Sequence, residues 1–211
     1  MAFAQSTRQA APALADRAAG EATTTPRPPQ PVKMVVSGGF GVGKTTAIGS
    51  VSENEPQTTE AAITEVAAGI DDVSMTPRKT TTTVAMDFGC LTLDPTLKLY
   101  IFGTPGQDRF GFMWKDVTAG ALGALVVVDS RRLDDCFPAV DYFERDGTPF
   151  AIAVNAFDGV LTHSLPAVRS ALDVAPEVPV VAFDARSADS VRESLIVVLE
   201  HALTRARGFQ G

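Results

Sequence analysis

A glycine-rich segment that ends in a lysine and a hydroxyl residue is the clearest chemical signal in the sequence. The run from Gly38 to Thr45 reads GGFGVGKT and fits the pattern GxxxxGK[ST], between a predicted strand and a predicted helix. Glycines let the loop curl with its backbone N–H groups pointing inward around a phosphate, and the helix N-terminus adds a positive dipole end. Lys44 would bridge β- and γ-phosphate oxygens, and Thr45 would offer a hydroxyl to Mg²⁺. The residues expected to hold the phosphates are Gly38, Gly39, Phe40, Gly41, Val42, Gly43, Lys44, Thr45 and Thr46.

A second candidate element, at 104–110, follows a predicted strand over 97–102, so its loop would emerge beside the phosphates. Here the chain resembles the small GTPases, whose switch II segment reads D-x-x-G-Q. In that family the glycine amide contacts the γ-phosphate and the glutamine orients the attacking water, roles that the resemblance assigns to Gly106 and Gln107. The continuation is similar to the Arf and Gα branch, and Trp114 resembles the switch II tryptophan of that branch.

One position departs from the small-GTPase pattern. Gly103 stands where that family has the Walker B aspartate, which helps to position Mg²⁺ through water, so weaker metal binding is expected. The bacterial gliding-motility GTPase MglA and the actinobacterial GTPases encoded in conservon operons resemble the chain in lacking this aspartate and in keeping a P-G-Q loop, here Pro105-Gly106-Gln107. Resemblance to this subgroup implies a partner of the roadblock/dynein light chain type.

A polar segment that begins at Arg78 leads into a predicted strand over 83–92 and looks like switch I. In small GTPases a threonine here contacts the γ-phosphate and Mg²⁺. The run TVAMDF, which starts at Thr83, resembles the Rab-type TIGVDF and favours Thr83 over the threonines at 80–82. Arg78 would act as an internal arginine finger by resemblance to Gα and MglA, which carry an arginine shortly before that threonine. The alternative is an ordinary solvated loop arginine.

Two short segments that follow later strands resemble the base-recognition motifs of small GTPases. The run from Asn155 to Asp158 reads NAFD, similar to N-K-x-D, and the Asp158 carboxylate would accept two hydrogen bonds from guanine N1 and N2. Adenine would leave polar groups unpaired there, so the motif predicts GTP and GDP rather than ATP. Ala156 replaces the lysine that usually lies along the base. Ala185 matches the alanine of S-A-K, whose amide meets guanine O6.

These motifs require a scaffold that brings the ends of several strands together. Candidate strands alternate with candidate helices, an order that implies right-handed crossovers and a mostly parallel sheet covered on both faces. The expected fold is an α/β three-layer sandwich of the Ras-like P-loop NTPase type, with about six strands. The predicted strands are 32–36, 83–92, 97–102, 121–128, 150–154 and 179–182, and the predicted helices are 44–51, 108–117, 137–145, 164–171 and 187–206.

The expected division of the chain is a flexible arm rich in Ala, Pro and Thr over 1–31, a G domain over 32–207 and a tail over 208–211. Prolines near the end of the arm remove backbone donors and disfavour regular structure. In the last predicted helix, apolar residues recur on one face and predict packing against the sheet. That stripe is formed by Val191, Leu195, Val198, Leu199 and Ala202.

Composition excludes several other classes of protein. The net charge of -7 opposes attraction to nucleic acid, which is therefore not an expected partner. Cys90 and Cys136 show neither a disulfide framework nor metal-site spacing, which is typical of packing residues in a reducing cytosol. The apolar run at 119–128 is about half of the ~20 residues that a membrane span needs. We expect a cytoplasmic protein without a transmembrane segment, for which membrane recruitment would pass through a partner.

The leading functional hypothesis is a GTP-driven switch in signal transduction. GTP and Mg²⁺ would order the segments around Thr83 and Gly106, and hydrolysis to GDP would release them. Hydrolysis would be slow, with Gln107 orienting the water while Lys44, Mg²⁺ and Arg78 neutralise the developing charge.

Two alternatives stay open. Gly103 and Ala156 would fit a nucleotide-loaded binding or scaffold module with negligible hydrolysis, and the phosphate loop by itself would fit an ATPase. The partner of a switch would dock on an apolar cluster at the predicted switch II helix, since exposed apolar patches mark interaction sites. That cluster consists of Phe110, Phe112, Met113 and Trp114.

Overall fold

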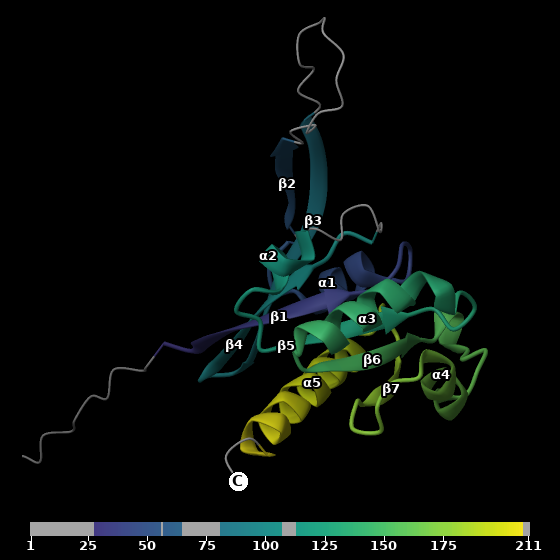
Figure 1. Ribbon diagram of the computed structural model, residues 1–211. Helices are drawn as coiled ribbons and strands as arrows, with labels where there is room; N and C mark the ends of the chain where they lie inside the picture. Colours follow the sequence, from purple (N-terminus) through teal and green to yellow (C-terminus); the bar gives the residue numbers. More distant parts are fainter. Residues whose placement is uncertain (1–27, 56, 65–80, 107–112, 209–211) are drawn as a thin grey trace, which may run out of the picture.

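The computed structural model describes residues 28–55, 57–64, 81–106 and 113–208 (Figure 1). Its middle layer is a seven-stranded sheet in the order β2-β3-β4-β1-β5-β6-β7. The strands are β1 (Gln30–Ser37), β2 (Gln57–Thr64), β3 (Thr81–Asp94), β4 (Leu97–Gly103), β5 (Gly123–Val128), β6 (Phe150–Asn155) and β7 (Val180–Phe183). The α-helices are α1 (Lys44–Val51), α2 (Trp114–Thr118), α3 (Phe137–Asp146), α4 (Leu165–Leu172) and α5 (Ala188–Gly208).

The centre of the sheet is parallel and one edge is antiparallel. β1 pairs in parallel with β4 and β5, and β5, β6 and β7 continue the parallel order. β3 runs antiparallel to β4, and β2 antiparallel to β3. Every residue of β5 (GALVVV) and β6 (FAIAVN) is buried, as expected of central parallel strands that are covered on both faces.

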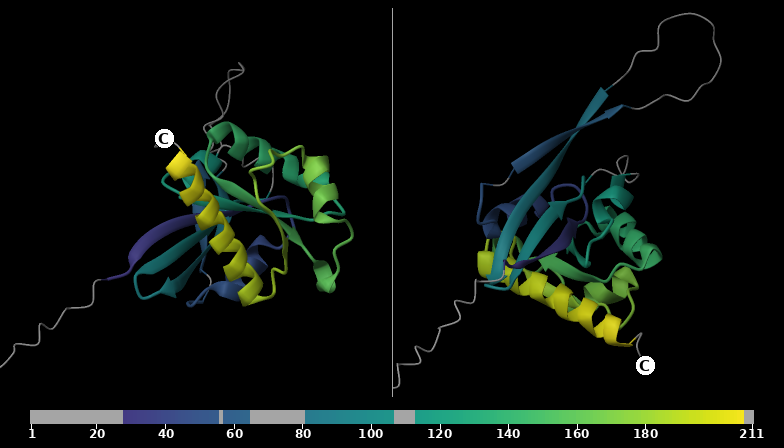
Figure 2. Two further views of the ribbon diagram at one scale, coloured as in Figure 1. Left: turned by 90° about the horizontal axis from the view of Figure 1, so that it is seen from below. Right: turned by 90° about the vertical axis from the view of Figure 1, so that its left-hand side faces the viewer.

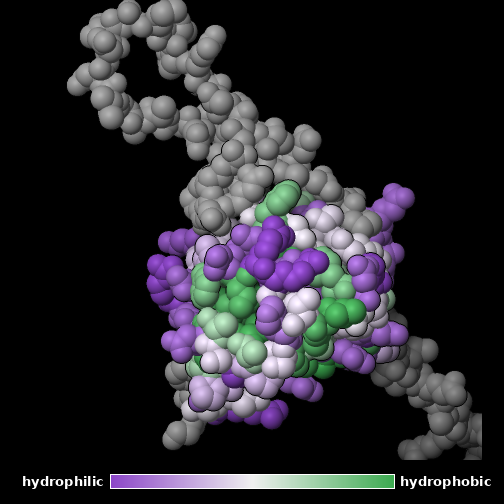
Figure 3. Space-filling model, turned by 90° about the vertical axis from the view of Figure 1, so that its right-hand side faces the viewer, coloured by the Kyte–Doolittle hydropathy of each residue, from purple (hydrophilic) through white to green (hydrophobic). Residues whose placement is uncertain are grey.

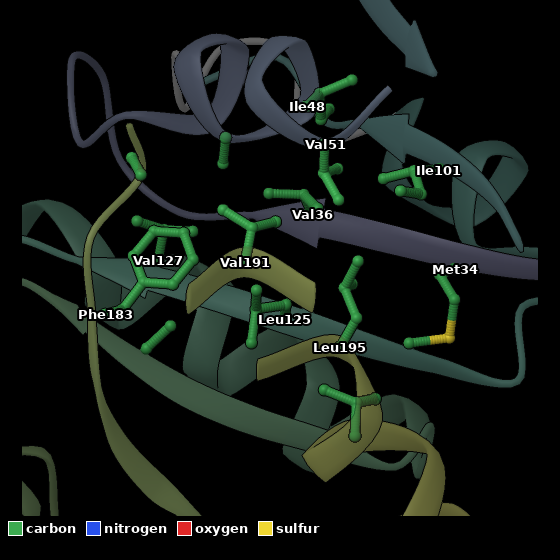
Figure 4. Packing of buried hydrophobic residues seen from close by; sticks show 14 of the residues in the cluster. Met34, Val36, Ile48, Val51, Ile101, Leu125, Val127, Phe183, Val191 and Leu195 are labelled. Atoms are coloured by element: carbon green, nitrogen blue, oxygen red, sulfur yellow. The ribbon is translucent and has the colours of Figure 1, made fainter. Parts of the chain in front are cut away.

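Helices cover both faces of the sheet (Figure 2). On one face, α1 and α5 pack against β1, β4 and β5 in a cluster that includes Val36, Ile48, Leu125 and Leu195 (Figure 4). On the other face, residues of α2, α3 and α4 pack around Phe143 in a second cluster. The three-layer α/β sandwich expected from the sequence is therefore confirmed.

The sequence did not predict β2, the seventh strand. Its sequence, QTTEAAIT, mixes polar and small residues, and its pairing runs along β3 alone. β2 and the adjoining part of β3 extend beyond the rest of the sheet in Figure 1. Hydrogen bonding to a distant segment, which local apolar patterning cannot report, accounts for this strand.

The other expected elements lie within a few residues of their predicted ranges. The helix expected at 108–117 is described only as α2, because 107–112 lie outside the described residues. Gln30 and Pro31, placed in the arm by the sequence, belong to β1, and α5 extends to Gly208. The apolar stripe of α5 is buried as predicted.

Both cysteines, Cys90 and Cys136, are buried and unpaired, in agreement with a packing role. Within the described part of the chain, no helix has the length and apolar character needed to cross a membrane.

Candidate functional site

The loop between β1 and α1 folds around the side chain of its own lysine. Gly43 directly precedes α1 with φ of 110°, a left-handed conformation that glycine adopts without strain. The Lys44 ammonium donates hydrogen bonds to the carbonyls of Gly38 (2.9 Å) and Gly39 (2.6 Å). Lys44 is only 8% exposed, and this burial lowers its pKa to about 8, although the nearby Asp87 charge acts in the opposite direction.

The loop after β4 lies against this lysine. A Cβ on Gly106 would be 2.5 Å from Lys44 Nζ and 2.9 Å from the Gly39 carbonyl oxygen, so only glycine fits here without a shift. Thr104 anchors the loop to β1, because its hydroxyl donates to Ser37 Oγ at 2.9 Å. The structure thus brings Gly106 beside the loop that contains Lys44.

A pocket of about 290 Å³ opens between these two loops. Residues of the first turn of α1 are part of its lining. Its lining residues are Phe40, Gly41, Gly43, Lys44, Thr45, Thr46, Asp87, Thr104, Pro105 and Gly106.

Asp87 is a charged residue of the pocket to which sequence reasoning assigned no role. It lies in β3, and its Oδ2 accepts a hydrogen bond of 2.6 Å from the Thr45 hydroxyl. The sequence signal was present, because Asp87 belongs to the TVAMDF run and Gly103 lacks a carboxylate. Recognising it requires knowing that β3 lies beside the end of β4.

The oxygen donors in this pocket fit a hard cation such as Mg²⁺. Mg²⁺ is usually bound through one or two carboxylates together with water and nucleotide phosphates. Thr45 and Asp87 offer a hydroxyl and a carboxylate, and nowhere in the described ranges do three or more His, Cys, Asp or Glu side chains converge as a metal site. A cation here would therefore depend on phosphate oxygens.

Asn155, at the end of β6, connects the phosphate loop to the loop after β7. Its side-chain amide donates to the Val42 carbonyl at 2.9 Å, and its Oδ1 accepts from the Ala185 N–H at 3.2 Å. Asn155 is 6% exposed, so these bonds are shielded from water. The Ala185 amide, expected to meet a base, donates to Asn155 here.

Asp158 lies in a short 3₁₀ turn, Phe157–Gly159, with φ of 56°. Its side chain is 88% exposed and accepts a hydrogen bond from the Arg186 guanidinium at 3.1 Å. Arg186, a residue that sequence reasoning did not select, also lies 3.5 Å from Asp184. The three candidate base-site residues Asn155, Asp158 and Ala185 are thus gathered at one edge of the sheet.

Several predicted site residues lie elsewhere or outside the description. Gln107 and Arg78, like Phe110 and Phe112, lie outside the described residues. The backbone of Thr83 pairs with Ala62 in the β2–β3 ladder, while its side chain is outside the described part. Thr83 lies four positions before Asp87 in the same strand, about 13 Å away at the usual rise per residue. This conformation does not bring Thr83 to Thr45.

Trp114 does not contribute to an exposed docking patch. It is 5% exposed and packs edge-to-face against Tyr142, with ring centroids 5.4 Å apart. The expected docking cluster is therefore wrong for Trp114, because its indole packs in the buried cluster formed by residues of α2, α3 and α4.

The face towards which β1 runs in Figure 1 is shown in Figure 3. Strongly hydrophilic residues gather near its centre, between hydrophobic ones. A bidentate ion pair follows the end of β5, where Arg131 Nε donates to Asp129 Oδ1 at 2.8 Å and Arg131 Nη2 donates to Asp129 Oδ2 at 2.7 Å. The Arg131 guanidinium lies 4.2 Å from the ring centroid of Phe157, next to the turn that holds Asp158.

Solved structures resemble the fold at low sequence identity. The G domain of the T. maritima FeoB iron transporter has a TM-score of 0.56 at 16% identity, covering 82% of this chain and 99% of that chain. The G domain of Methanococcus jannaschii FeoB has a TM-score of 0.53 at 13% identity, covering 81% of this chain and 99% of that chain. The cytosolic domain of the T. maritima FeoB iron transporter in GDP form I has a TM-score of 0.57 at 17% identity, covering 83% of this chain and 65% of that chain. These likenesses establish the fold of a P-loop GTPase domain.

Sequence comparison gives a relative and a family. Uncharacterized protein MJ1339 of Methanocaldococcus jannaschii is 33% identical over 129 residues, which is 60% of this chain and 71% of that protein. A family described as "conserved hypothetical ATP binding protein" matches residues 36–205, from the end of β1 into α5. The chain therefore belongs to this family of conserved hypothetical ATP binding proteins.

Proposed function

We propose that the chain is a guanine-nucleotide switch, which binds GTP or GDP with Mg²⁺ and hydrolyses GTP slowly. The observation that carries the proposal is the link through Asn155, which joins the loop of Lys44 to the segments of Asp158 and Ala185. One nucleotide would place its phosphates at the first loop and its base at the other two. The choice of a guanine nucleotide is supported by the T. maritima FeoB domain, which has a similar fold and was solved in a GDP form.

The phosphate end follows from the charges of the pocket. Lys44 would leave the Gly38 and Gly39 carbonyls for β- and γ-phosphate oxygens, and the amides of its loop would surround the β-phosphate. Mg²⁺ would neutralise charge that develops during cleavage. Gly106 would direct its amide to the γ-phosphate, Gln107 would orient the water, and Arg78 would stabilise the transition state in cis.

The base end depends on the carboxylate of Asp158. Guanine presents two donors, N1–H and the 2-amino group, whereas adenine presents an acceptor at N1 and no 2-amino group. A carboxylate would therefore bind guanine and leave adenine unpaired, a difference worth several kcal/mol in a closed site. Arg186 would release Asp158 when the base binds. Its alkyl chain would then lie along the ring, where small GTPases have the lysine that Ala156 replaces.

ATP is the second candidate, because the family description names it. In that case Asp158 would stay paired with Arg186 and would not read the base. The two candidates differ in competition assays with a labelled nucleotide, in which GTP and GDP should compete at least 100-fold better than ATP if Asp158 reads guanine.

The decisive variant is Asp158→Asn, whose amide would favour xanthine, a base with a carbonyl in place of the 2-amino group. We expect Asp158→Asn to lose GTP affinity and gain xanthosine triphosphate affinity. Asp173→Asn is a matched control. The backbone of Asp173 is also left-handed, with φ of 51°, but this residue follows the end of α4 rather than β6. Equal affinity for ATP and GTP, unchanged by Asp158→Asn, would establish the ATP-binding alternative.

The partner and the cellular role complete the proposal. By resemblance to MglA and the conservon GTPases, a roadblock/dynein light chain type protein would read the nucleotide state in the cytoplasm and accelerate hydrolysis by positioning Gln107 or Arg78. Single-turnover GTP cleavage, measured with and without such a partner, tests this role. Tight GTP binding without cleavage in either condition would instead support a nucleotide-loaded scaffold.

A further inference from the structure

The last residue of β4 leaves a space that a side chain from β3 occupies. The two strands are antiparallel and Phe88 pairs with Phe102, so Asp87 lies opposite Gly103. A Cβ on Gly103 would be 3.1 Å from the Cβ of Asp87 and 3.4 Å from its Oδ2. Any larger residue at 103 would therefore compete with Asp87 for one volume.

From this position Asp87 reaches the first turn of α1. Its carboxylate accepts the Thr45 hydroxyl at 2.6 Å, and it lines the same pocket as Lys44 and Gly106. Asp87 is half-buried. The space beside Gly103 is bounded on its other side by Ile48, whose Cδ1 would lie 3.0 Å from a Cβ at 103. A larger side chain at 103 would therefore meet both Asp87 and the buried core.

The charge of Asp87 is unfavourable for a bare polyanion. A nucleotide phosphate at the loop of Lys44 would approach this carboxylate, and like charges repel strongly at short range in a partly desolvated site. A divalent cation between the two removes the repulsion and joins them. The site is thus better suited to a metal–phosphate complex than to phosphate alone.

We infer that Asp87 supplies from β3 the carboxylate that Gly103 lacks on β4, and that it holds a divalent cation beside Thr45 and the nucleotide phosphates. The inference rests on the proposed nucleotide binding. Asp87 and Thr45 would hold the cation together, since their side-chain oxygens already lie 2.6 Å apart. The cation therefore needs no carboxylate at position 103.

The test is the effect of Mg²⁺ on nucleotide affinity in the full chain, measured with fluorescent GDP in Mg²⁺ and in EDTA. In Asp87→Asn, we expect the gain in affinity due to Mg²⁺ to fall by roughly 10- to 100-fold, the usual cost of losing a partner around a metal. Affinity in EDTA should stay the same or rise, because a negative charge has left the site. Asp94→Asn removes another β3 carboxylate far from the pocket and should change neither value.

A charge transplant makes the test independent of the stability of one variant. Asp87→Gly combined with Gly103→Asp moves the carboxylate from β3 to β4 and removes the steric conflict between the two positions. We expect this double variant to recover most of the Mg²⁺ effect that Asp87→Gly loses. Bound Mn²⁺, counted by electron paramagnetic resonance in the GDP complex, should follow the same order, and circular dichroism verifies folding.

The outcomes separate this inference from the proposed function. If the unmodified chain binds no nucleotide, the proposed function fails and the inference fails with it. If it binds GDP with a clear Mg²⁺ effect that Asp87→Asn retains in full, the inference alone is overturned, and Asp87 only orients the Thr45 hydroxyl.

Discussion

Lys44 is bound by the loop that precedes it in the chain. Its ammonium is bound by two carbonyls of the same loop, and burial lowers its pKa from 10.5 to about 8. Between these values the unfolded chain binds more protons at this residue than the folded chain. The free energy of unfolding therefore contains a contribution from Lys44 that rises with pH through this window.

We predict that Lys44→Met removes this pH dependence. At pH 9.5 the unmodified protein should have gained about 2 kcal/mol from Lys44 relative to pH 7, because each pKa unit corresponds to about 1.4 kcal/mol. Urea unfolding of both proteins at the two pH values measures the difference. If the free energy of unfolding changes equally with pH in both proteins, the pKa of Lys44 is the same in the folded and the unfolded chain.

Asn155 is predicted to matter for stability as well as for binding. Asn155→Ala leaves the Val42 carbonyl and the Ala185 N–H without their partner, which should lower the free energy of unfolding by about 1–3 kcal/mol. Nucleotide affinity should fall too, because the two loops lose their connection. Asn54→Ala, which removes an amide bound to Cys90 Sγ near the surface, should cost under about 0.5 kcal/mol. Equal losses in both variants would contradict a special role for Asn155.

At the scale of elements, the site is assembled from strand ends that meet at one edge of the sheet. The loop after β1 supplies Lys44, the loop after β4 supplies Gly106, and β6 and β7 lead to the base side. The antiparallel strand β3 adds Asp87 from the side. Since each loop follows a strand of the same hydrogen-bonded sheet, the sheet fixes their relative positions.

Helix α2 offers a direct report on the nucleotide state. Trp114 is the only tryptophan, and it is buried against Tyr142 shortly after the segment 107–112. We predict that exchanging GDP for a non-hydrolysable GTP analogue changes tryptophan emission, because a shift of Gly106 would move α2 and repack this pair. Tyr142→Phe keeps the ring but removes its hydroxyl contact with Thr118, so the response should survive. Nucleotide exchange without any change in emission would show that α2 stays in place.

At the scale of the whole molecule, the proposed ligand would join loops that belong to both halves of the sheet. We predict that Mg²⁺ and GDP at about 100 times the dissociation constant stabilise the fold by about 2.7 kcal/mol. For a domain of this size, that corresponds to a rise in melting temperature of about 5–10 °C. Differential scanning fluorimetry measures it, and ATP should give a smaller rise at equal concentration. Equal rises with the two nucleotides would favour the ATP candidate.

The order of most elements and the position of the glycine-rich loop could be predicted from the sequence. Local patterns sufficed for these, because the glycine spacing before Lys44 and the apolar runs of β5 and β6 depend on neighbours along the chain. The same local patterns placed Asn155 and Asp158 after a strand over 150–154; Asn155 is the last residue of β6 and Asp158 follows it.

Contacts between residues that are distant in the sequence became visible only in the folded chain. Asp87 and Gly103 are not neighbours in sequence, and their placement opposite each other follows from the register of β3 on β4. Likewise β2, the burial of Trp114 and the pairing of Asp158 with Arg186 arise from contacts between separate segments. Local sequence encodes what one segment prefers, whereas strand register and helix packing decide which side chains share a site.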